Sequence, residues 1–419
     1  MFDYEPYSNA HEDDPYPVYA RLRASAPVHY APESDVWCVS RYDDVQAVLS
    51  NSEVFKSKTQ GFQQRQLRER GSRLSQLRMA ARFMIKTRIP PWKMLNSRML
   101  IMEDGPIHRD MRNTVNRGFT PRRIQAWEKR IRELVDGCMA QAREKQRFDL
   151  VEELAIPLPV TVIAEMLGVE SERFLDFKRW SDTIISGATG PAAFGEGGER
   201  VAAALGEMRA YLAPIVRARR ASPRDDLVSV LVAAEHADRP LDDHEIFLFF
   251  LLLLVAGNET TTNLLGNATD ALLDNEDQLA KVVRDPALVK GVVEETLRFD
   301  SPVQFISRLT AVDAELRGVS IPANSIVLVM LAAANRDPER FENPDCFDIE
   351  RDTRGHLGLG FGEHFCLGAS LARLEATAAL DALIPALPNL ERVTPQREFL
   401  DSYLIRGRSR LELGPRSAG

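Results

Sequence analysis

Disulfide pairs and clustered metal ligands are missing from this sequence. Its 419 residues include only four cysteines, scattered at Cys38, Cys138, Cys346 and Cys366. That spacing fits neither a disulfide framework nor a zinc site, which uses closely spaced pairs of ligands. The sequence therefore favours a reducing compartment, and we expect a cytoplasmic protein.

Long apolar segments are also missing. The most apolar run covers residues 246–257 and stops at Asn258 and Glu259. A helix needs about 20 apolar residues to cross a bilayer, so this run predicts a buried core helix and no transmembrane segment. The N-terminus is acidic and contains proline, unlike the basic and then apolar pattern of a signal peptide.

Positive charge is in deficit overall. With 53 Lys+Arg against 61 Asp+Glu the net charge is −8, which gives a nucleic-acid partner no electrostatic support. A composition of 44% hydrophobic and 27% charged residues is that of a globular protein. The length allows several domains or one large enzyme domain; we expect a single domain over residues 1–419, and a monomer.

Helical periodicity dominates the chain, with short β-type runs near both ends. This predicts a mainly α fold with small β-sheets, of the α+β class. The glycine-rich residues 186–198 predict a flexible connection between two helices, and a lid. Other expected elements are a helix at 15–23, a hairpin of 28–30 with 36–39, a helix at 121–142, strands at 319–321 and 326–330, and a last helix at 367–383.

One cysteine has an unusual setting, because Cys366 follows the glycine-rich stretch 358–362 and precedes a predicted helix. Glycine lets the backbone pass close to a bulky flat ligand, and a helix N-terminus favours a thiolate. Such a thiolate suits the fifth coordination position of haem iron, where it favours O–O cleavage. The alternative is an ordinary buried cysteine, but Gly362-x-His364-x-Cys366-x-Gly368 should arise by chance in roughly one of several thousand such chains.

This loop resembles the haem-binding signature of the cytochrome P-450 family, most of all its soluble bacterial branch. The resemblance extends from about Asp14 to the C-terminus. It implies a single-domain P-450 fold, with haem b between a long central helix and the cysteine loop, and no flavin or iron–sulfur cluster bound to this chain. At the position of Leu359 the family usually has a phenylalanine; in this sequence the nearest phenylalanine is Phe361, two residues later. This departure bears on the redox tuning of the haem.

The predicted core helix ends in a polar notch. Leu252, Ala256 and Thr260 are four residues apart and share one face of the helix. Glycine destabilises a helix interior relative to alanine, so Gly257 indicates a functional requirement at this point. A hydroxyl and a carboxylate there suit bound dioxygen and a proton supply, with a local opening of the helix. The alternative is a helix that merely becomes polar at its exit. The matching family motif implies Glu259 as the acid and Thr260 as the alcohol.

The resemblance also implies the remaining site residues, although surface salt bridges are the alternative for the cations. Glu295 and Arg298, three apart on a helix, can pair. The family positions that bind haem propionates are His108, Arg112, Arg308 and His364, and those that contact haem are Ala256, Gly257 and Phe361. A structural network is implied for Glu295, Arg298 and Arg351. The implied substrate pocket comprises Leu252, Ala256, Val303, Phe305, Ile306, Tyr403 and Leu404.

Residues 56–98 are strongly basic, and the resemblance implies that they form an insert in the loop over the distal pocket. Twelve basic residues and one acid, Glu69, give this segment a charge of +11. Apolar residues from Leu67 to Met84 recur at helical spacing and predict an amphipathic helix, with Trp92 available to a ligand. Three interpretations stay open: a solvated helix, a clamp for an acidic substrate such as a fatty acid or a carrier-bound acyl group, and contact with an anionic membrane. The basic residues are Lys56, Lys58, Arg65, Arg68, Arg70, Arg73, Arg78, Arg82, Lys86, Arg88, Lys93 and Arg98.

These features together predict a monooxygenase that hydroxylates or epoxidises a small, largely apolar substrate. By the resemblance, its electrons come from a separate acidic ferredoxin-type donor and its reductase. The alternatives are a peroxide-using haem-thiolate enzyme and a non-catalytic haem sensor or electron carrier. A solvated basic face where the donor could dock is expected at Arg109, Arg117, Arg122 and Arg123.

Overall fold

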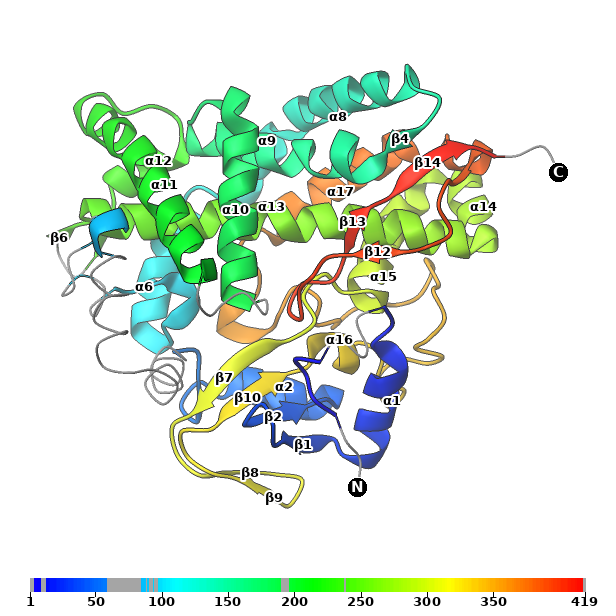
Figure 1. Ribbon diagram of the computed structural model, residues 1–419, viewed down its shortest axis with the longest axis horizontal. Helices are drawn as coiled ribbons and strands as arrows, with labels where there is room; N and C mark the ends of the chain where they lie inside the picture. The colour runs from blue at the N-terminus through cyan, green and yellow to red at the C-terminus, as the bar shows by residue number, and fades with distance from the viewer. Residues whose placement is uncertain are drawn as a thin grey trace.

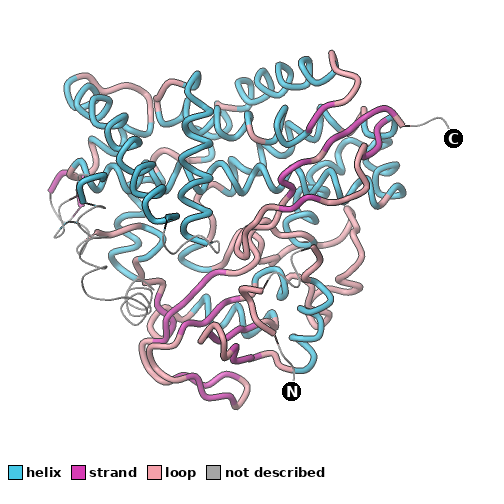
Figure 2. Tube along the Cα trace, in the orientation of Figure 1, coloured by secondary structure: helices cyan, strands magenta, loops and turns pink. Residues whose placement is uncertain are grey.

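The computed structural model describes residues 4–8, 13–58, 84–87, 89, 93, 97–189, 196–236 and 239–416. Most of the helices lie in one half of the molecule, and the largest sheet lies in the other half (Figures 1 and 2). The prediction of a mainly helical fold with small sheets is confirmed. Most of the basic segment 56–98, including its expected amphipathic helix and Trp92, lies outside the described residues.

Helix α13, Asp243–Asp274, runs through the middle of the helical half (Figure 1). Its start is set by a capping box, in which the Asp242 carboxylate accepts the N–H groups of His244 and Glu245. The helix extends beyond the apolar run at both ends, so it is long and apolar enough to cross a membrane by length and composition alone. However, 72% of its apolar window is buried inside the molecule, as in the core helix of a compact protein.

Several helices surround α13, and two expected boundaries were wrong. The helix expected at 121–142 is divided at Trp127 into α7 and α8. The glycine-rich connection is shorter than expected, because α10 continues to Thr189 and α11 begins at Glu196. The main helices are α1 Tyr16–Ser25, α2 Tyr42–Ser50, α6 Gly105–Asn116, α7 Pro121–Ala126, α8 Glu128–Arg143, α9 Pro157–Leu167, α10 Phe174–Thr189, α11 Glu196–Ala221, α12 Leu227–Val232, α14 Glu276–Arg284, α15 Val289–Phe299, α16 Leu331–Ala334 and α17 Ala369–Leu383.

The largest sheet joins segments that are far apart in sequence. Its strand order is β1-β2-β10-β7-β3; the expected hairpin pairs Val28 with Val39, and β10 adds in parallel to β2. A second sheet has the order β11-β14-β4. The strands are β1 Val28–Ala31, β2 Val36–Val39, β3 Phe55–Lys56, β4 Phe148–Asp149, β5 Glu235–His236, β6 Arg239–Pro240, β7 Ile306–Thr310, β8 Ala314–Leu316, β9 Val319–Ile321, β10 Ile326–Val329, β11 Leu390–Arg392, β12 Glu398–Phe399, β13 Arg408–Arg410 and β14 Glu412–Pro415.

Separate apolar cores lie in the two halves. The large one packs α8, α9, α15 and α17 around α13, and smaller ones lie on either face of the five-stranded sheet. The loop that carries Cys366 spans this division: Leu359 packs against the large core and Phe361 against a sheet core. This position lets residues from both halves reach the cysteine.

Candidate active site

The cysteine loop is held in a conformation that needs glycine. Gly360 and Gly362 have positive φ angles of 75° and 70°, which residues with a Cβ rarely adopt. A Cβ on Gly358 would overlap the carbonyl oxygen of Leu297. The N–H of Cys366 donates to the carbonyl of Leu359 at 2.8 Å and closes the loop. Helix α17 then begins at Ala369, close to where it was expected.

A buried ionic network supports this loop, as the resemblance implied. Arg298, fully buried, donates from Nε and Nη2 to the two oxygens of Glu295 at 2.7 Å each. Arg351 Nε lies 3.2 Å from the same carboxylate. Arg298 Nη1 also donates to the carbonyl of Asn335 at 3.0 Å, and Asn335 Oδ1 accepts the N–H of Leu357 at 2.6 Å. No sequence pattern indicated Asn335, since an asparagine in an irregular stretch is too common.

A mostly apolar cavity of about 220 Å³ lies between α13 and the cysteine loop. Leu252, Ala256, Gly257 and Thr260 line it from α13, as the four-residue spacing predicted. Cys366 lines the opposite side. The sequence therefore identified both walls of this cavity, although no pattern in it placed them against each other.

The Cys366 thiol is set among positive charges. Burial raises its pKa, while the N–H of Gly368 and the charges of Arg112 and Arg373 lower it. Arg373 is itself held by Glu294, whose carboxylate accepts from Arg373 Nη2 at 2.8 Å. A metal ion at the sulfur would displace the proton outright, so this setting suits a thiolate ligand.

Three of the four predicted propionate ligands line the cavity; the fourth, Arg308, does not. His108 and Arg112 line it from α6, and His364 lines it from the cysteine loop. His108 is 1% exposed, and neither of its ring nitrogens makes a hydrogen bond to a described residue. Its ring lies 4.2 Å from that of His364. Burial and the neighbouring charge of His364 lower the pKa of His108 to about 4, so it is neutral at pH 7.

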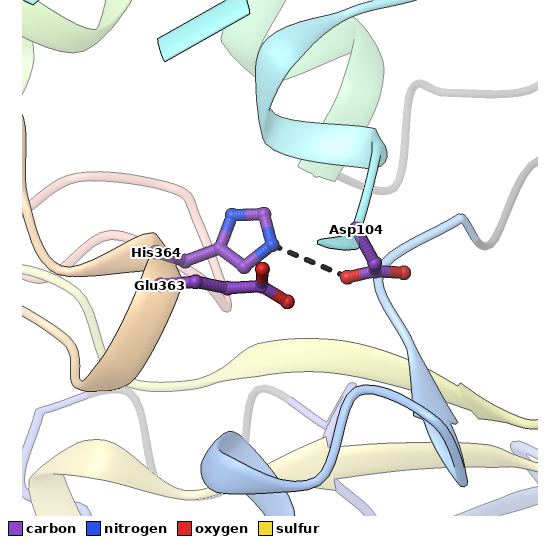
Figure 3. A group of neighbouring side chains, drawn as sticks. All are labelled: Asp104, Glu363 and His364. Carbon is purple, nitrogen blue, oxygen red and sulfur yellow. Dashed lines mark hydrogen bonds and ion pairs between the residues drawn. The ribbon is translucent and has the colours of Figure 1, made fainter. Parts of the chain in front are cut away.

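Acidic groups that the sequence did not indicate lie at the same end. His364 Nε2 is 3.3 Å from Asp104 Oδ1 (Figure 3). The same nitrogen is 3.0 Å from Ser57 Oγ. Asp104, Glu363 and His364 offer ligand atoms within 4.8 Å of one another. Arg308, on β7, is buried nearby; burial lowers its pKa, and the charges of Asp104 and Glu363 raise it. These acids orient the cations around the cavity end.

Arg112 has a contact that the resemblance did not imply. Its Nη1 donates to the carbonyl of Glu363 at 3.0 Å, and its Nη2 donates to the carbonyl of Phe365 at 2.6 Å. Arg112 therefore fixes the backbone on both sides of His364, next to the cysteine.

The predicted acid, Glu259, does not line the cavity with Thr260. Its carboxylate faces α10, where Lys178 Nζ donates to Oε1 at 3.0 Å. On α13 itself, Asn258 Nδ2 donates to the same oxygen at 3.3 Å. Lys178 also binds Asp182 on its own helix. Burial raises the pKa of Glu259 to about 7, while the charge of Lys178 lowers it and Asp182 raises it.

The expected opening of the helix is wrong for this structure. Helix α13 is continuous through Gly257, and Thr260 Oγ1 donates to the carbonyl of Ala256 at 2.9 Å. The hydroxyl therefore bonds within its own helix turn, and the backbone there stays helical.

Part of the expected substrate pocket lies elsewhere. Among the described residues, those that line this cavity do not include the expected pocket residues Val303, Phe305, Ile306, Tyr403 and Leu404. The expected haem contact Phe361 does not line it either. The rings of Phe305 and Tyr403 instead lie 6.2 and 5.7 Å from that of Tyr7. The two predicted stretches do meet, because Val303 bridges to Ile405. The N-terminal segment that covers them carried no sequence motif.

The fold and this site define a class of enzyme with a cysteine and a helix hydroxyl on opposite walls of one cavity. A family model described as Cytochrome P450 matches residues 81–387. The chain is 38% identical to the vitamin D(3) 25-hydroxylase of Pseudonocardia autotrophica, over 98% of this chain and 97% of that one. It is 40% identical to the cytochrome P450 monooxygenase PikC of Streptomyces venezuelae, over 90% of this chain and 85% of that one.

A solved structure has the same fold. The cytochrome P450 CYP109E1 of Bacillus megaterium, in complex with testosterone, aligns with a TM-score of 0.80 and 33% identity, over 96% of this chain and 100% of that one. The chain therefore belongs to the cytochrome P450 family. As such it is a haem-dependent monooxygenase that acts on an organic substrate.

Proposed function

We propose that Cys366 is the axial ligand of the haem iron and that Thr260 acts on the oxygen side of the haem. One observation carries this proposal: the thiol and the hydroxyl line opposite walls of the same cavity. Bound haem supplies the activation of dioxygen with electrons delivered from outside. The chain supplies the ligand, the cations that hold the haem, and the groups that deliver protons.

The residues present fit a haem. Its two propionates need cationic or hydrogen-bonding partners at one edge, and His108, Arg112, Arg308 and His364 supply them there. The unbonded ring nitrogens of His108 support this assignment, since a buried polar atom without a partner is rare. Arginine is well matched to a carboxylate because its planar fork bonds it bidentately.

Thr260 and Glu259 have separate roles in proton supply. The Thr260 hydroxyl lines the cavity and donates its hydrogen to the Ala256 carbonyl. Its oxygen can accept a hydrogen bond from a ligand, and it can donate one to a ligand by turning away from that carbonyl. The Glu259 carboxylate is held away by Lys178, so its delivery of a proton requires the ion pair to open and the side chain to turn. With a pKa of about 7, Glu259 can both accept and release a proton at neutral pH.

The electron donor in this proposal is a separate acidic ferredoxin-type protein with its reductase, in the cytoplasm. Arg109, Arg117 and Arg122 are exposed and support an acidic partner. Arg123 is also exposed, but it pairs with Asp225 at 3.0 Å. The acid–alcohol pair favours this over direct use of peroxide or a non-catalytic role. The substrate is apolar, in keeping with the wall of α13; the relatives include a protein named as a vitamin D(3) hydroxylase and one solved with testosterone.

An acidic group on the substrate is a second proposal, based on the insert 56–98. Three of its described lysines lie near acids of the chain itself: Lys58 is 3.8 Å from Glu103, Lys86 is 3.3 Å from Glu199, and Lys93 is 2.7 Å from Asp242. A carboxylate clamp would therefore use other cations of the insert. Binding of a long-chain acid and of its methyl ester, compared at several salt concentrations, tests it. Equal affinity at every chain length rejects the clamp.

The main proposal is tested by whether Cys366 is the ligand of the haem iron. The reduced, carbon-monoxide-bound protein should give the strongly red-shifted absorption band of thiolate ligation. Cys366→Ala and Cys366→His should lose this band, and a band that persists in either variant rejects the proposal. Turnover with generic ferredoxin and reductase, set beside turnover with peroxide alone, tests the electron source.

A further inference from the structure

Two polar side chains lack hydrogen-bond partners where helix α11 packs against α13. Arg209, on α11, has its Nη1 atom shielded from solvent and without a hydrogen bond in the described part of the chain. His244, in the first turn of α13, is 4% exposed, and its Nδ1 atom is equally unbonded there. The charge of Arg209 acts on the His244 ring, so the two groups are neighbours. Buried polar atoms without a partner are rare, and this pair therefore indicates a ligand.

Two residues of the insert, Lys93 and Ser97, determine how the His244 ring can bind that ligand. Ser97 Oγ donates its hydrogen to the Lys93 carbonyl at 2.5 Å and lies 2.7 Å from His244 Nε2. Because a hydroxyl has one hydrogen, Nε2 supplies the hydrogen of the second contact. The other ring nitrogen, Nδ1, then accepts a hydrogen bond when the ring is neutral and donates one when the ring is protonated.

The acids at the start of α13 are bound to other cations. Asp242 binds Lys93 at 2.7 Å, Asp243 binds Arg220 at 2.9 Å, and Glu245 binds Arg239 at 2.7 Å. Burial lowers the pKa of Arg209, and the charges of Asp243 and Asp242 raise it. Over the described ranges, however, no acid forms an ion pair with Arg209. A partly buried cation without a contact partner favours an anionic ligand over a neutral one.

We propose that Arg209 and His244 bind the carboxylate at one end of an elongated apolar substrate. This rests on the proposed function, and it places the acid group of the substrate between α11 and α13 rather than on the cations of the insert. The planar fork of Arg209 matches a carboxylate. Protonated His244 adds a second donor, at Nδ1.

The bound carboxylate supplies the charge that keeps His244 protonated. Without a ligand, burial and the charges of Arg209 and Lys93 lower the pKa of His244, and the charges of Asp242 and Glu245 raise it. A carboxylate in contact with the ring raises this pKa further, because the opposite charge favours the protonated form. Binding of the acid at neutral pH therefore takes up a proton from solvent.

The position of this site sets the length of the substrate. Leu252, two turns further along α13, lines the cavity together with Ala256 and Thr260. His244 and Ala256 are twelve residues apart in one helix, so the helix axis advances about 18 Å between them. Each bond of an extended alkyl chain advances by less than its own length of about 1.5 Å. The oxidised carbon is therefore at least about twelve bonds from the carboxyl group.

The test compares the binding of hexadecanoic acid and of its methyl ester by the haem-loaded protein and by Arg209→Gln. The acid should bind about tenfold more weakly to the variant, whereas the ester should bind equally well to both. Arg209→Lys, which keeps the charge but loses the fork, should recover part of the affinity for the acid. Arg217→Gln changes an exposed arginine of the same helix; it is the matched control and should bind both ligands as the unmodified protein does.

Two outcomes of the binding test overturn the proposal. Equal affinity of Arg209→Gln and the unmodified protein for the acid would place the carboxylate on other cations, such as those of the insert. An equal loss of affinity for acid and ester would mean that Arg209 has only a structural role.

The position of oxidation gives a second test. With tetradecanoic, hexadecanoic and octadecanoic acids, the unmodified enzyme should place the hydroxyl group at one fixed distance from the carboxyl group, because that end is anchored. In Arg209→Gln the hydroxyl group should spread over several positions. A hydroxyl group that keeps a fixed distance from the methyl end instead overturns the proposal.

Calorimetry gives a readout independent of turnover. At pH 7, in two buffers of different ionisation enthalpy, binding of the acid should take up about one proton and binding of the ester none; no uptake with the acid overturns the assignment of His244. Failure of the proposed function is distinguishable, because it would appear as a missing thiolate band in the unmodified protein while binding of the acid still depended on Arg209.

Discussion

The two walls of the cavity are built in different ways. The cysteine loop rests on fully buried Arg298, which bonds both oxygens of Glu295, and on backbone bonds from Arg112 and Asn335. On the oxygen side, the Glu259 carboxylate is paired with Lys178. Lys178 is shared, because it also pairs with Asp182. A group that must hold iron in one position benefits from many satisfied hydrogen bonds. A group that moves protons needs an ion pair that opens easily and a pKa near the working pH.

The largest expected effect is on the cysteine side. Arg298→Ala leaves Glu295 as a buried carboxylate bonded to Arg351 and to the N–H of Asp348 but without its bidentate partner. Breaking a buried pair in this way destabilises by about 3–5 kcal/mol. We expect most of the variant to be isolated without haem and with a much lower Tm. Haem content per polypeptide and thermal unfolding measure this. Near-normal values for both would show that the two walls do not differ in rigidity.

A smaller effect is expected from crowding the same loop. Gly358→Ala places a methyl group against the Leu297 carbonyl, and overpacking of this kind destabilises by about 1–3 kcal/mol. The control is Gly137→Ala on α8, where the added methyl meets no atom within 4 Å and better helix propensity should stabilise by about 0.5–1 kcal/mol. Thermal unfolding of both should give Tm changes of opposite sign.

On the oxygen side, Thr260→Ala should leave folding and haem content near normal. It removes a hydroxyl that satisfies only the carbonyl of its own helix turn, so the structure does not depend on it. We expect product per electron to fall about tenfold, equivalent to about 1.4 kcal/mol of barrier, with peroxide rising in step. Product and peroxide per NADH oxidised measure this, and unchanged coupling would remove Thr260 from the mechanism.

The smallest effect is a pH dependence at Glu259. Its pKa in the folded protein is about 7, above the ordinary carboxyl value, so the folded state binds the extra proton and stability falls as pH rises from about 4.5 to 7. Lys178→Gln removes the cation that lowers this pKa and should extend the loss to higher pH. A tenfold weaker acid would extend it by about 1.4 kcal/mol. Thermal unfolding at pH 5.5 and pH 8 tests the sign.

The matched change is Asp182→Asn, which removes the acid that raises the pKa of Glu259. It should reduce the stability difference between pH 5.5 and pH 8. If both variants change stability equally at the two pH values, Glu259 is not the titrating group.

Local pattern was enough to predict some parts of the molecule. The glycines before Cys366 and the spacing of Leu252, Ala256 and Thr260 identified both walls of the cavity, because backbone freedom and helical periodicity are properties of short segments. The pairing of Glu295 with Arg298 follows from the same periodicity. The insert 56–98, whose pattern was equally clear, is largely outside the described residues, and its role stays a prediction.

Other features depend on contacts between distant segments. The local sequence determined the hairpin of β1 and β2, the start of α13 at its capping box and the conformation of the glycine-rich cysteine loop. Each of these depends on hydrogen bonds or backbone angles of residues that are close together in sequence. Only the tertiary structure turned Glu259 toward Lys178, brought Asp104 to His364, seated Tyr7 on Phe305 and Tyr403, and placed Arg209 near His244. The physical reason is that burial and charge pairing, which set the position and pKa of these groups, arise from packing between elements rather than from any local sequence pattern.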